Sequence, residues 1–262
     1  MRNHHTDKLE NPLMNFRCND NALEGYCILV TGAGDGIGRS VALLCAKLGA
    51  HVLLLGRTET KLNAVYDEIE TYKENSATII PFDLEKTEED QYTQIAGFVE
   101  QQFGKLNGLI HCASALGSIQ PLSQTKAETF LTIIQTNLNS HFLLTKAMLS
   151  LLAESPSASV VFTSSGVGRQ ARAYWGAYSI SKVAVEAMNS IWAAELGAAE
   201  KIRFNTLNPG PTNTAMRRSA YPTEKPDTNP SPSEIAWAYV YLLCKESTGL
   251  NGQQLDAQLK KS

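Results

Sequence analysis

The sequence predicts a single α/β domain in which helices cover both faces of a parallel β-sheet. Short apolar runs alternate with longer amphipathic stretches along the whole chain, as expected for parallel strands joined by helical crossovers. The 262 residues, 43% of them hydrophobic and 19% charged, are enough to fill one large core. No linker interrupts the alternation. We therefore expect one domain over residues 22–262, after a mobile N-terminal arm over residues 1–21 that lacks periodic apolar residues.

The predicted strands are the short apolar runs, and the predicted helices are the amphipathic stretches between them. The strands cover residues 26–31, 51–55, 77–82, 106–111, 159–163, 203–207 and 253–256. The helices cover residues 37–48, 59–72, 87–103, 125–152, 173–196 and 233–243. Gly49 is placed to end the first helix.

One long segment breaks the regular alternation. Residues 209–232 contain six prolines among Thr, Asn and Ser, and they predict no regular element. A run of this length inside a compact domain is usually functional, often a lid over a site. The alternative is a surface insertion that the fold tolerates.

Composition excludes several classes of function. The net charge of −3 and the pI near 6.0 give the chain no overall positive electrostatic potential that would attract nucleic acid or an anionic membrane. A small-molecule partner is therefore favoured. The apolar runs are far shorter than the ~20 residues that span a bilayer. Five cysteines without a CxxC pair argue against disulfides and against a structural metal site, and they favour the reducing cytoplasm.

A glycine-rich turn follows the first predicted strand and leads into the first helix. It reads Thr31-Gly32-Ala33-Gly34-Asp35-Gly36-Ile37-Gly38, which fails the GxGxxG spacing and fits TGxxxGxG with Gly32, Gly36 and Gly38. Glycines allow a tight turn and let backbone amides approach a pyrophosphate at the positive end of the helix. The turn therefore predicts a nucleotide site.

Arg57 stands at the end of the second predicted strand, where an acidic residue would bind a free ribose 2′-hydroxyl. A guanidinium at this place suits a 2′-phosphate instead, so we expect NADP (NADPH) as cofactor. NAD is the alternative, which Asp35 in the turn mildly favours, and Arg57 would then be an ordinary surface charge.

Tyr178 and Lys182 lie four residues apart in a predicted helix and therefore share one helix face. An ammonium beside a phenol stabilises the phenolate and moves the pKa of the tyrosine toward the working range of a general acid or base. Ser165 stands thirteen residues before Tyr178 at the end of the fifth strand, and Asn137 stands 28 residues before Ser165.

Together these motifs resemble the short-chain dehydrogenase/reductase family over nearly all of residues 26–258, and 3-oxoacyl-carrier-protein reductases within it. The resemblance implies a Rossmann-type doubly wound sheet with strand order 3-2-1-4-5-6-7. It also implies a catalytic tetrad, with Tyr178 as acid and base, Lys182 tuning it and holding the nicotinamide ribose, Ser165 bonding the substrate carbonyl, and Asn137 supporting a water relay. The thirteen-residue offset selects Ser165 over its neighbour Ser164.

The resemblance further implies which residues bind the cofactor. Besides Tyr178 and Lys182 they are Thr31, Gly32, Gly36, Ile37, Gly38, Arg57, Asp83, Leu84, Ala113, Pro209, Gly210, Thr212 and Thr214. The pair Asp83-Leu84 resembles the family's adenine-binding pair, and Asn208-Pro209-Gly210 with Thr214 resembles its nicotinamide-side loop. No metal is required.

The chain departs from the family pattern after the fourth strand. The family's Asn-Asn-Ala-Gly reads His111-Cys112-Ala113-Ser114 here, so only the alanine is kept. In the first interpretation the site is repacked without loss of function. In the second, cofactor affinity is weakened and Cys112 becomes a thiol beside the cofactor.

The expected function is NADP-dependent hydride transfer between nicotinamide and a carbonyl or alcohol substrate, as in a carbonyl reductase. The alternative is a nucleotide-binding regulatory module with the same fold and little turnover. Epimerisation or dehydration on the same scaffold stays open, because fold does not decide function. Family members usually assemble as homodimers or homotetramers, and the long predicted helices over residues 125–152 and 173–196 would supply the interface.

The substrate is constrained only by side chains near the expected mouth of the site. Aromatic and thioether groups there suit an apolar substrate such as a 3-oxoacyl compound or another ketone, and arginines suit an anionic tail or an acidic carrier protein. The alternative is that the arginines are solvated and the apolar groups belong to the core. These residues are Arg169, Arg172, Tyr174, Trp175, Met216, Arg217, Arg218 and Tyr221.

Overall fold

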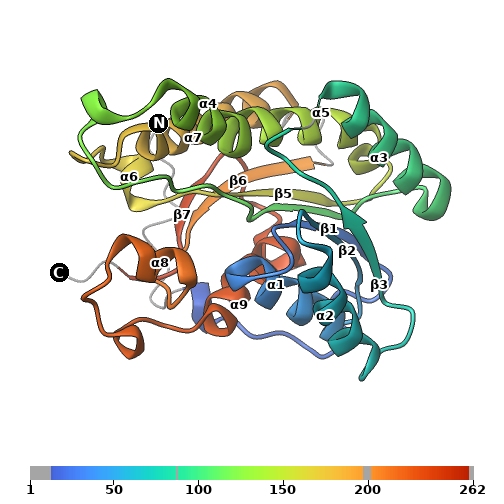
Figure 1. Cartoon of the computed structure of the whole chain (residues 1–262). Helices are drawn as coiled ribbons and strands as arrows, with labels where there is room; N and C mark the ends of the chain where they lie inside the picture. The colour runs from blue at the N-terminus through green and yellow to red at the C-terminus, as the bar shows by residue number, and fades with distance from the viewer. Residues whose placement is uncertain (1–12, 87, 197–201, 260–262) are drawn as a thin grey trace.

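The computed structural model describes residues 13–86, 88–196 and 202–259, and it has three layers with a parallel sheet between two layers of helices (Figure 1). The seven strands lie in the order β3-β2-β1-β4-β5-β6-β7, and neighbouring strands pair in parallel. Their bounds are β1 Cys27–Thr31, β2 His51–Gly56, β3 Ala77–Pro81, β4 Gly108–His111, β5 Ala158–Thr163, β6 Ile202–Asn208 and β7 Gln254–Asp256. The predicted fold class and strand order are confirmed.

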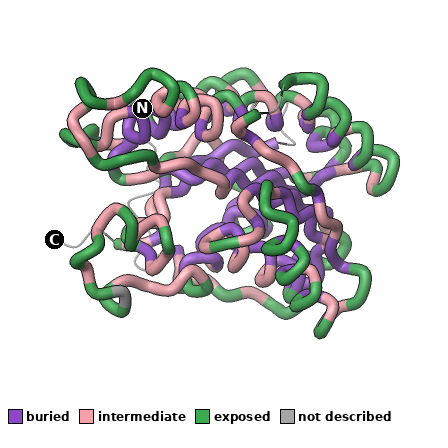
Figure 2. Tube along the Cα trace, in the orientation of Figure 1, coloured by how far each residue is buried: buried purple, intermediate pink, exposed green. Residues whose placement is uncertain are grey.

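The strands form where apolar residues run without interruption, because both faces of the sheet are covered. In β1 every residue is buried: Ile28 and Val30 belong to the core on one face, and Cys27 and Leu29 to the core on the other. This alternation follows from the two-residue period of a strand. Figure 2 shows the buried positions concentrated in the sheet and on the inner sides of the helices.

Each face of the sheet carries its own set of helices (Figure 1). One face is covered by α1 (Gly36–Lys47), α2 (Glu59–Glu70) and α9 (Pro232–Leu243). The other is covered by α3 (Glu89–Phe103), α4 (Ala127–Ile134), α5 (Ser140–Ala153) and α7 (Gly176–Leu196). The predicted stop after α1 is confirmed, since Gly49 has φ +106°. No helix in the described part of the chain is long and apolar enough to cross a membrane.

The helix predicted over residues 125–152 forms over residues 127–153, but its middle is not α-helical. A π-helical turn at Gln135–Asn139 separates α4 from α5. The turn holds Asn137, whose buried side chain bonds the backbone of Ala115 instead of facing solvent. Wider turns of this kind are common at functional positions, and apolar periodicity does not reveal them.

Two further elements differ from expectation. The helix expected from residue 173 begins at Gly176, because Tyr174 has φ +73° and turns the chain first. The proline-rich segment is not without structure, since it carries the short helix α8 (Ala215–Ala220), capped by Thr214. Another short helix, α6 (Gly166–Arg169), follows β5. Thr87, the expected first residue of a helix, lies outside the described residues.

The expectation of a mobile arm is wrong for residues 13–21. Leu13 is buried, Met14 N donates to Ala257 O at 3.2 Å, and the Phe16 ring meets the Tyr241 ring of α9 edge-on at 5.1 Å. The few apolar residues involved are too short a run to show a period, so the sequence pattern missed this contact. Residues 1–12 of the expected arm lie outside the described residues.

A buried ion pair joins α7 to the carboxyl edge of the sheet. Glu186 lies one turn beyond Lys182, and its carboxylate accepts from Arg169 Nε at 3.0 Å and Thr206 Oγ1 at 2.6 Å, and from the Ser164 hydroxyl. Only 6% of the Glu186 side chain is exposed, so these donors replace its hydration.

The same network extends through Arg169 to the last strand. Arg169 donates to the Asp256 carboxylate at 3.3 Å and to the Leu255 carbonyl at 2.8 Å. Asp256 in turn accepts from Asn208 Nδ2 at 2.7 Å, and Asn208 Oδ1 accepts from Gly210 N at 3.1 Å. The network therefore fixes the ends of β5, β6 and β7 relative to α7.

Replacing Glu186 by Leu should destabilise the fold by about 3–5 kcal/mol, because the half-buried Arg169 guanidinium loses one of its two carboxylate partners and two buried hydroxyls lose their acceptor. Glu186→Gln should cost less, since the amide oxygen still accepts. Urea unfolding followed by circular dichroism measures both. Lys146→Met is the control: it breaks an exposed ion pair with Glu89 and should cost under about 1 kcal/mol. Equal midpoints for Glu186→Leu and Lys146→Met would show that the buried carboxylate does not stabilise the fold.

Candidate active site

A cavity of about 710 Å³ opens at the carboxyl ends of the strands, where the strand order reverses between β1 and β4. It is lined by the segments that directly follow β1, β2, β3, β4, β5 and β6, and by α7 and α8. Every predicted catalytic or cofactor-binding residue lines it except Thr31 and Asn137, whereas Arg169, Tyr174 and Arg218, predicted near its mouth, do not. The volume lies within the ~300–1,000 Å³ range of small-molecule and cofactor sites.

The glycine turn requires glycine at specific positions. Gly32 and Gly36 have φ of +67° and +52°, the left-handed region that other residues rarely adopt. A Cβ on Gly32 would lie 3.0 Å from the Cα of Ala113, and one on Gly38 would collide with the carbonyl oxygen of Gly32. Close contact between turn, helix and the chain after β4 thus leaves backbone surface facing the cavity.

Thr31 does not line the cavity but supports its wall from inside the fold. Its buried hydroxyl accepts from the backbone N–H groups of Cys112 at 3.1 Å and Ala113 at 3.0 Å, which ties β1 to the segment after β4. The structure therefore places Thr31 as a support of the cavity wall.

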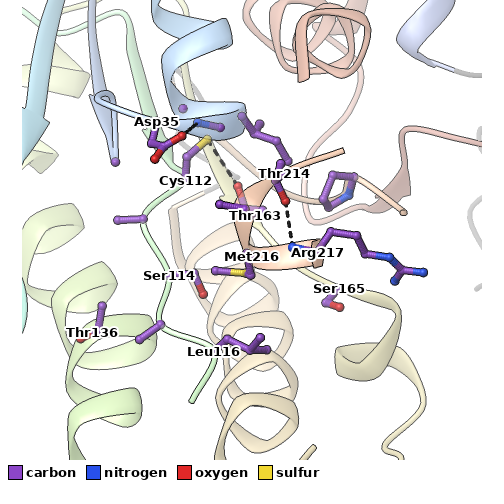
Figure 3. Close-up of a pocket in the computed structure, with 18 of the residues that line it drawn as sticks. Asp35, Cys112, Ser114, Leu116, Thr136, Thr163, Ser165, Thr214, Met216 and Arg217 are labelled. Atoms are coloured by element: carbon purple, nitrogen blue, oxygen red, sulfur yellow. Dashed lines mark hydrogen bonds between the residues drawn. The ribbon is translucent and has the colours of Figure 1, made fainter. Parts of the chain in front are cut away.

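The side chains at one end of the cavity are charged. Asp35 caps α1 by accepting from Gly36 N at 2.7 Å and pairs with Lys61 Nζ at 2.5 Å, and this hydrogen bond to Lys61 lowers the pKa of Asp35 (Figure 3). Arg57 is 71% exposed, and its NH1 atom lies 3.8 Å from the Glu85 carboxylate. Thr58 and Lys61 line the same end and were not predicted from the sequence, where their only signal is that they follow Arg57 into α2.

Ser165, Tyr178 and Lys182 lie together at the other end of the cavity. Lys182 is fully buried and donates to the Thr163 carbonyl at 2.7 Å, with Nζ 5.7 Å from the centre of the Tyr178 ring. Burial lowers the pKa of Lys182 to about 8, although Cys112 and Glu186 act in the opposite direction. Burial also raises the pKa of Tyr178, and a hydrogen bond with Ser165 offsets part of that shift.

Asn137 stands behind these three residues. Its Oδ1 accepts from Ala115 N at 2.7 Å, and its Nδ2 donates to Ala115 O at 2.9 Å and Ser181 Oγ at 3.0 Å. Ser181 lies next to Lys182 on α7. The amide thus joins the π-helical turn both to the chain after β4 and to the helix that carries Tyr178.

The segment that departs from the family pattern is tied in by other contacts. His111 Nε2 lies 2.9 Å from Thr145 Oγ1, and the His111 ring centroid lies 4.5 Å from that of His141 and 4.9 Å from that of Phe162, with the three rings nearly parallel. Burial lowers the pKa of His111 to about 3, and nearby Lys182 adds to the shift. The ring is therefore neutral at pH 7 and packs as an aromatic group between β4 and α5.

Cys112 lines the cavity as a protonated thiol. Its Sγ accepts from Thr163 Oγ1 at 3.6 Å, and that hydroxyl also bonds Tyr239 OH at 2.9 Å (Figure 3). Burial raises the pKa of Cys112 to about 12. Only the thiolate is reactive, and a thiol with so high a pKa stays protonated at pH 7. Cys112 therefore serves as a packing residue in the cavity wall.

Two hydroxyls fit a sugar-containing ligand. Ser114 Oγ and Thr136 Oγ1 are buried and have no hydrogen-bond partner within the described part of the chain, and both residues line the cavity. Buried hydroxyls are rarely left unsatisfied, so these sites suit the ribose and phosphate oxygens of a dinucleotide. Among the residues that the structure describes, no group of three or more His, Cys, Asp or Glu side chains could hold a metal ion.

The loop after β6 forms another wall of the cavity and meets the glycine turn. Gln258 Nε2 donates to the carbonyls of Pro209 and Pro211, each at 2.8 Å, and Thr214 Oγ1 accepts from Arg217 N at 3.1 Å (Figure 3). The Thr214 methyl lies 3.6 Å from where a Cβ on Gly36 would stand. The loop thereby brings α8, with Met216, against the cavity.

The chain is similar to known proteins over most of its length. The family model described as short chain dehydrogenase matches residues 26–225. The uncharacterised oxidoreductase YciK of Escherichia coli K12 is 40% identical over 245 residues, 94% of this chain and 96% of that protein. The 3-oxoacyl-[acyl-carrier-protein] reductase FabG of Thermotoga maritima is 30% identical over 240 residues, 88% of this chain and 95% of that protein.

A solved structure agrees with these matches. The short chain dehydrogenase of Shigella flexneri 2a, crystallised as a complex with NADP, superposes with a TM-score of 0.90 at 40% identity, covering 92% of this chain and 100% of that one. The family match covers the glycine turn and the Tyr178–Lys182 helix, the two segments that form opposite ends of the cavity. The chain therefore belongs to the short-chain dehydrogenase family of oxidoreductases.

Proposed function

We propose that this chain uses NADP(H) to transfer a hydride between the nicotinamide ring and a carbonyl or alcohol substrate. The observation that carries the proposal is that Ser165, Tyr178 and Lys182 line the same cavity as the glycine turn. A nucleotide held at the turn would reach from the charged end to the buried tyrosine. When bound, the nicotinamide ring supplies or accepts the hydride.

In this proposal Tyr178 is the general acid for reduction. Its raised pKa keeps the phenol protonated at pH 7, so it can donate to a carbonyl oxygen as negative charge develops there. Lys182, with a pKa of about 8, is mostly an ammonium at pH 7 and stabilises the phenolate that remains. Ser165 bonds the same carbonyl oxygen, and Asn137 holds α7 and the chain after β4 in place; its predicted part in a water relay stays a prediction.

The cofactor would be held by the glycine turn and by the loops that follow the strands. The backbone at Gly32, Gly36, Ile37 and Gly38 would face the pyrophosphate, Asp83 and Leu84 the adenine, and Ala113 with the loop from Pro209 to Thr214 the nicotinamide half. Arg57, exposed at the end of β2, would fork onto the 2′-phosphate. The NADP in the Shigella relative supports NADP over NAD.

The substrate end of the cavity is largely apolar. Leu116, Trp175, Met216 and Tyr221 line it beside Tyr178, which supports an apolar ketone as substrate. The similarity to a 3-oxoacyl-[acyl-carrier-protein] reductase makes a 3-oxoacyl compound one candidate. The alternative of a regulatory module with little turnover is not favoured, because binding alone gives no reason to bury a lysine beside a tyrosine.

The protein is proposed to form homodimers or homotetramers through α7. Ile180, Val183 and Ile191 lie on the side of this helix opposite its buried stripe and are 43%, 45% and 56% exposed. An exposed apolar stripe of this kind is typical of a subunit interface. Leu131 of α4, which packs beside α7, is 65% exposed. All five cysteines are unpaired, which supports the cytoplasm as the proposed location.

Arg57→Ala should weaken NADPH binding about ten- to a hundredfold and leave NADH binding nearly unchanged, because only NADPH carries the 2′-phosphate. Fluorescence titration with each nucleotide measures this. Arg39→Ala is the matched control, since Arg39 pairs with Glu68 and does not line the cavity. Tighter binding of NADH than NADPH by the unaltered protein would contradict the NADP assignment.

Tyr178→Phe should lower NADPH-dependent carbonyl reduction by at least about a hundredfold, because the general acid is lost, and should change NADPH affinity less than about threefold. Turnover is followed by the loss of NADPH absorbance with a panel of ketones. Tyr174→Phe is the control, as that side chain is 59% exposed and does not line the cavity. Unchanged turnover in Tyr178→Phe would remove Tyr178 from the proposed mechanism.

Sedimentation of the intact protein should give a multiple of the 28.6 kDa chain mass. Val183→Glu should shift the distribution toward the monomer, because it places a charge in the apolar stripe of α7. Phe98→Glu, on the exposed side of α3, is the control and should leave the mass unchanged. A monomer at every protein concentration would overturn the proposed assembly.

A further inference from the structure

The four arginines predicted near the mouth of the cavity differ in whether another residue bonds their guanidinium group. Arg169 belongs to the buried network with Glu186 and Asp256. Arg217 makes two 2.6 Å bonds to the Glu224 carboxylate and stacks on the Tyr221 ring at 3.7 Å. Arg218 donates to Asn213 Oδ1 at 2.9 Å. Arg172 lines the cavity, and no described residue forms an ion pair or hydrogen bond with its guanidinium.

Arg172 is held at the cavity by a strained turn. Trp175 N donates to the Arg172 carbonyl at 3.3 Å, and Tyr174 between them has φ +73°, a left-handed conformation that non-glycine residues rarely adopt. The Tyr174 carbonyl accepts from Gln120 N at 3.0 Å, which fixes the turn to the segment after β4. In this turn Arg172 and Trp175 line the cavity, while the Tyr174 side chain between them faces solvent.

Trp175 connects the tyrosine of the site to the mouth. Its ring centroid lies 5.9 Å from that of Tyr178 and 5.9 Å from that of Tyr221. Leu116 and Met216 line the same region (Figure 3). A ligand whose oxygen meets Tyr178 would therefore pass along an apolar wall and reach one guanidinium that has no partner among the described residues.

We propose that the substrate is a small oxo acid, or the corresponding hydroxy acid, whose carboxylate binds Arg172 while its ketone lies at Ser165 and Tyr178. This inference rests on the proposed function. In the reduction the carbonyl carbon gains the hydride from NADPH, the oxygen gains the Tyr178 proton, and a secondary alcohol and NADP⁺ result. A single free guanidinium suits one carboxylate bound through two hydrogen bonds. An acidic carrier protein would need several free cations around the mouth, and Arg169 and Arg217 are already paired with carboxylates.

The test compares oxo acids with their own methyl esters. In a homologous series with increasing distance between ketone and carboxylate, kcat/KM with NADPH should favour the acid over the ester by at least about tenfold for one length. Arg172→Gln should remove this preference by slowing the acid only. Arg172→Lys should keep part of it, and Arg218→Gln, which changes an arginine outside the cavity lining, should keep all of it.

A binding measurement separates this inference from the proposed function. Trp175 lies within the proposed site, so the acid should quench tryptophan fluorescence of the NADPH-bound protein. The same quenching should be lost in Trp175→Phe, and the affinity it reports should be weakened about tenfold or more in Arg172→Gln. Arg172-dependent binding without any turnover would support the carboxylate site at Arg172 and overturn both the proposed function and the assignment of the acid as a substrate.

Three outcomes would overturn the oxo-acid inference. The first is equal reduction of acid and ester by the unaltered protein, which would leave the proposed function intact. The second is an equal loss for both substrates in Arg172→Gln. The third is a strong preference for the acyl-carrier-protein thioester over the free acid that depends on Arg172, which would assign the guanidinium to a protein partner.

Discussion

The buried contact between the Glu186 carboxylate and the Arg169 guanidinium joins the parts of the fold that form the substrate end of the cavity. A carboxylate removed from water needs donors from several directions, and Glu186 receives them from α6, β6 and the end of β5. Arg169 carries the constraint on to β7 and the loop after β6. The helix that bears Tyr178 and Lys182 is thereby fixed against the strands whose loops complete the cavity, so the geometry at Tyr178 depends on a charge pair that is largely shielded from solvent.

The segment His111-Cys112-Ala113-Ser114, which replaces the family's Asn-Asn-Ala-Gly, shows that different side chains can hold the same central part of a parallel sheet together. The family's amide side chains are absent, yet Thr31 still joins β1 to the chain after β4 through two backbone hydrogen bonds. His111 adds a cluster of three nearly parallel rings from β4, β5 and α5. The neutral imidazole of His111 supplies both a hydrogen bond to Thr145 and a flat packing surface. In this chain, imidazole and hydroxyl groups therefore hold this wall of the cavity in place of the family's amide side chains.

Local patterns predicted the strands and the glycine turn well, because a buried parallel strand and a left-handed glycine depend mainly on residues close in sequence. They failed where distant partners decide the conformation. Asn137 lies in a π-helical turn and bonds the backbone of Ala115, 22 residues away, and Tyr174 adopts a positive φ within a turn bonded to Gln120. The tetrad positions came from the family resemblance. The partners of Arg169 and Arg217 lie in other elements or behind a turn, so spacing alone could not separate them from Arg172.

The segment at residues 13–17 has a consequence for the order of events during synthesis. Its contacts are with α9 and with Ala257, residues made more than two hundred positions later. The Arg17 guanidinium lies 4.5 Å from the Trp237 ring and has no such surface to cover while the nascent chain is still short. Long-range contacts of this kind form slowly because the loop they close is large. Residues 13–17 can therefore reach their final contacts only after residues 237–257 have been synthesised and have left the ribosome.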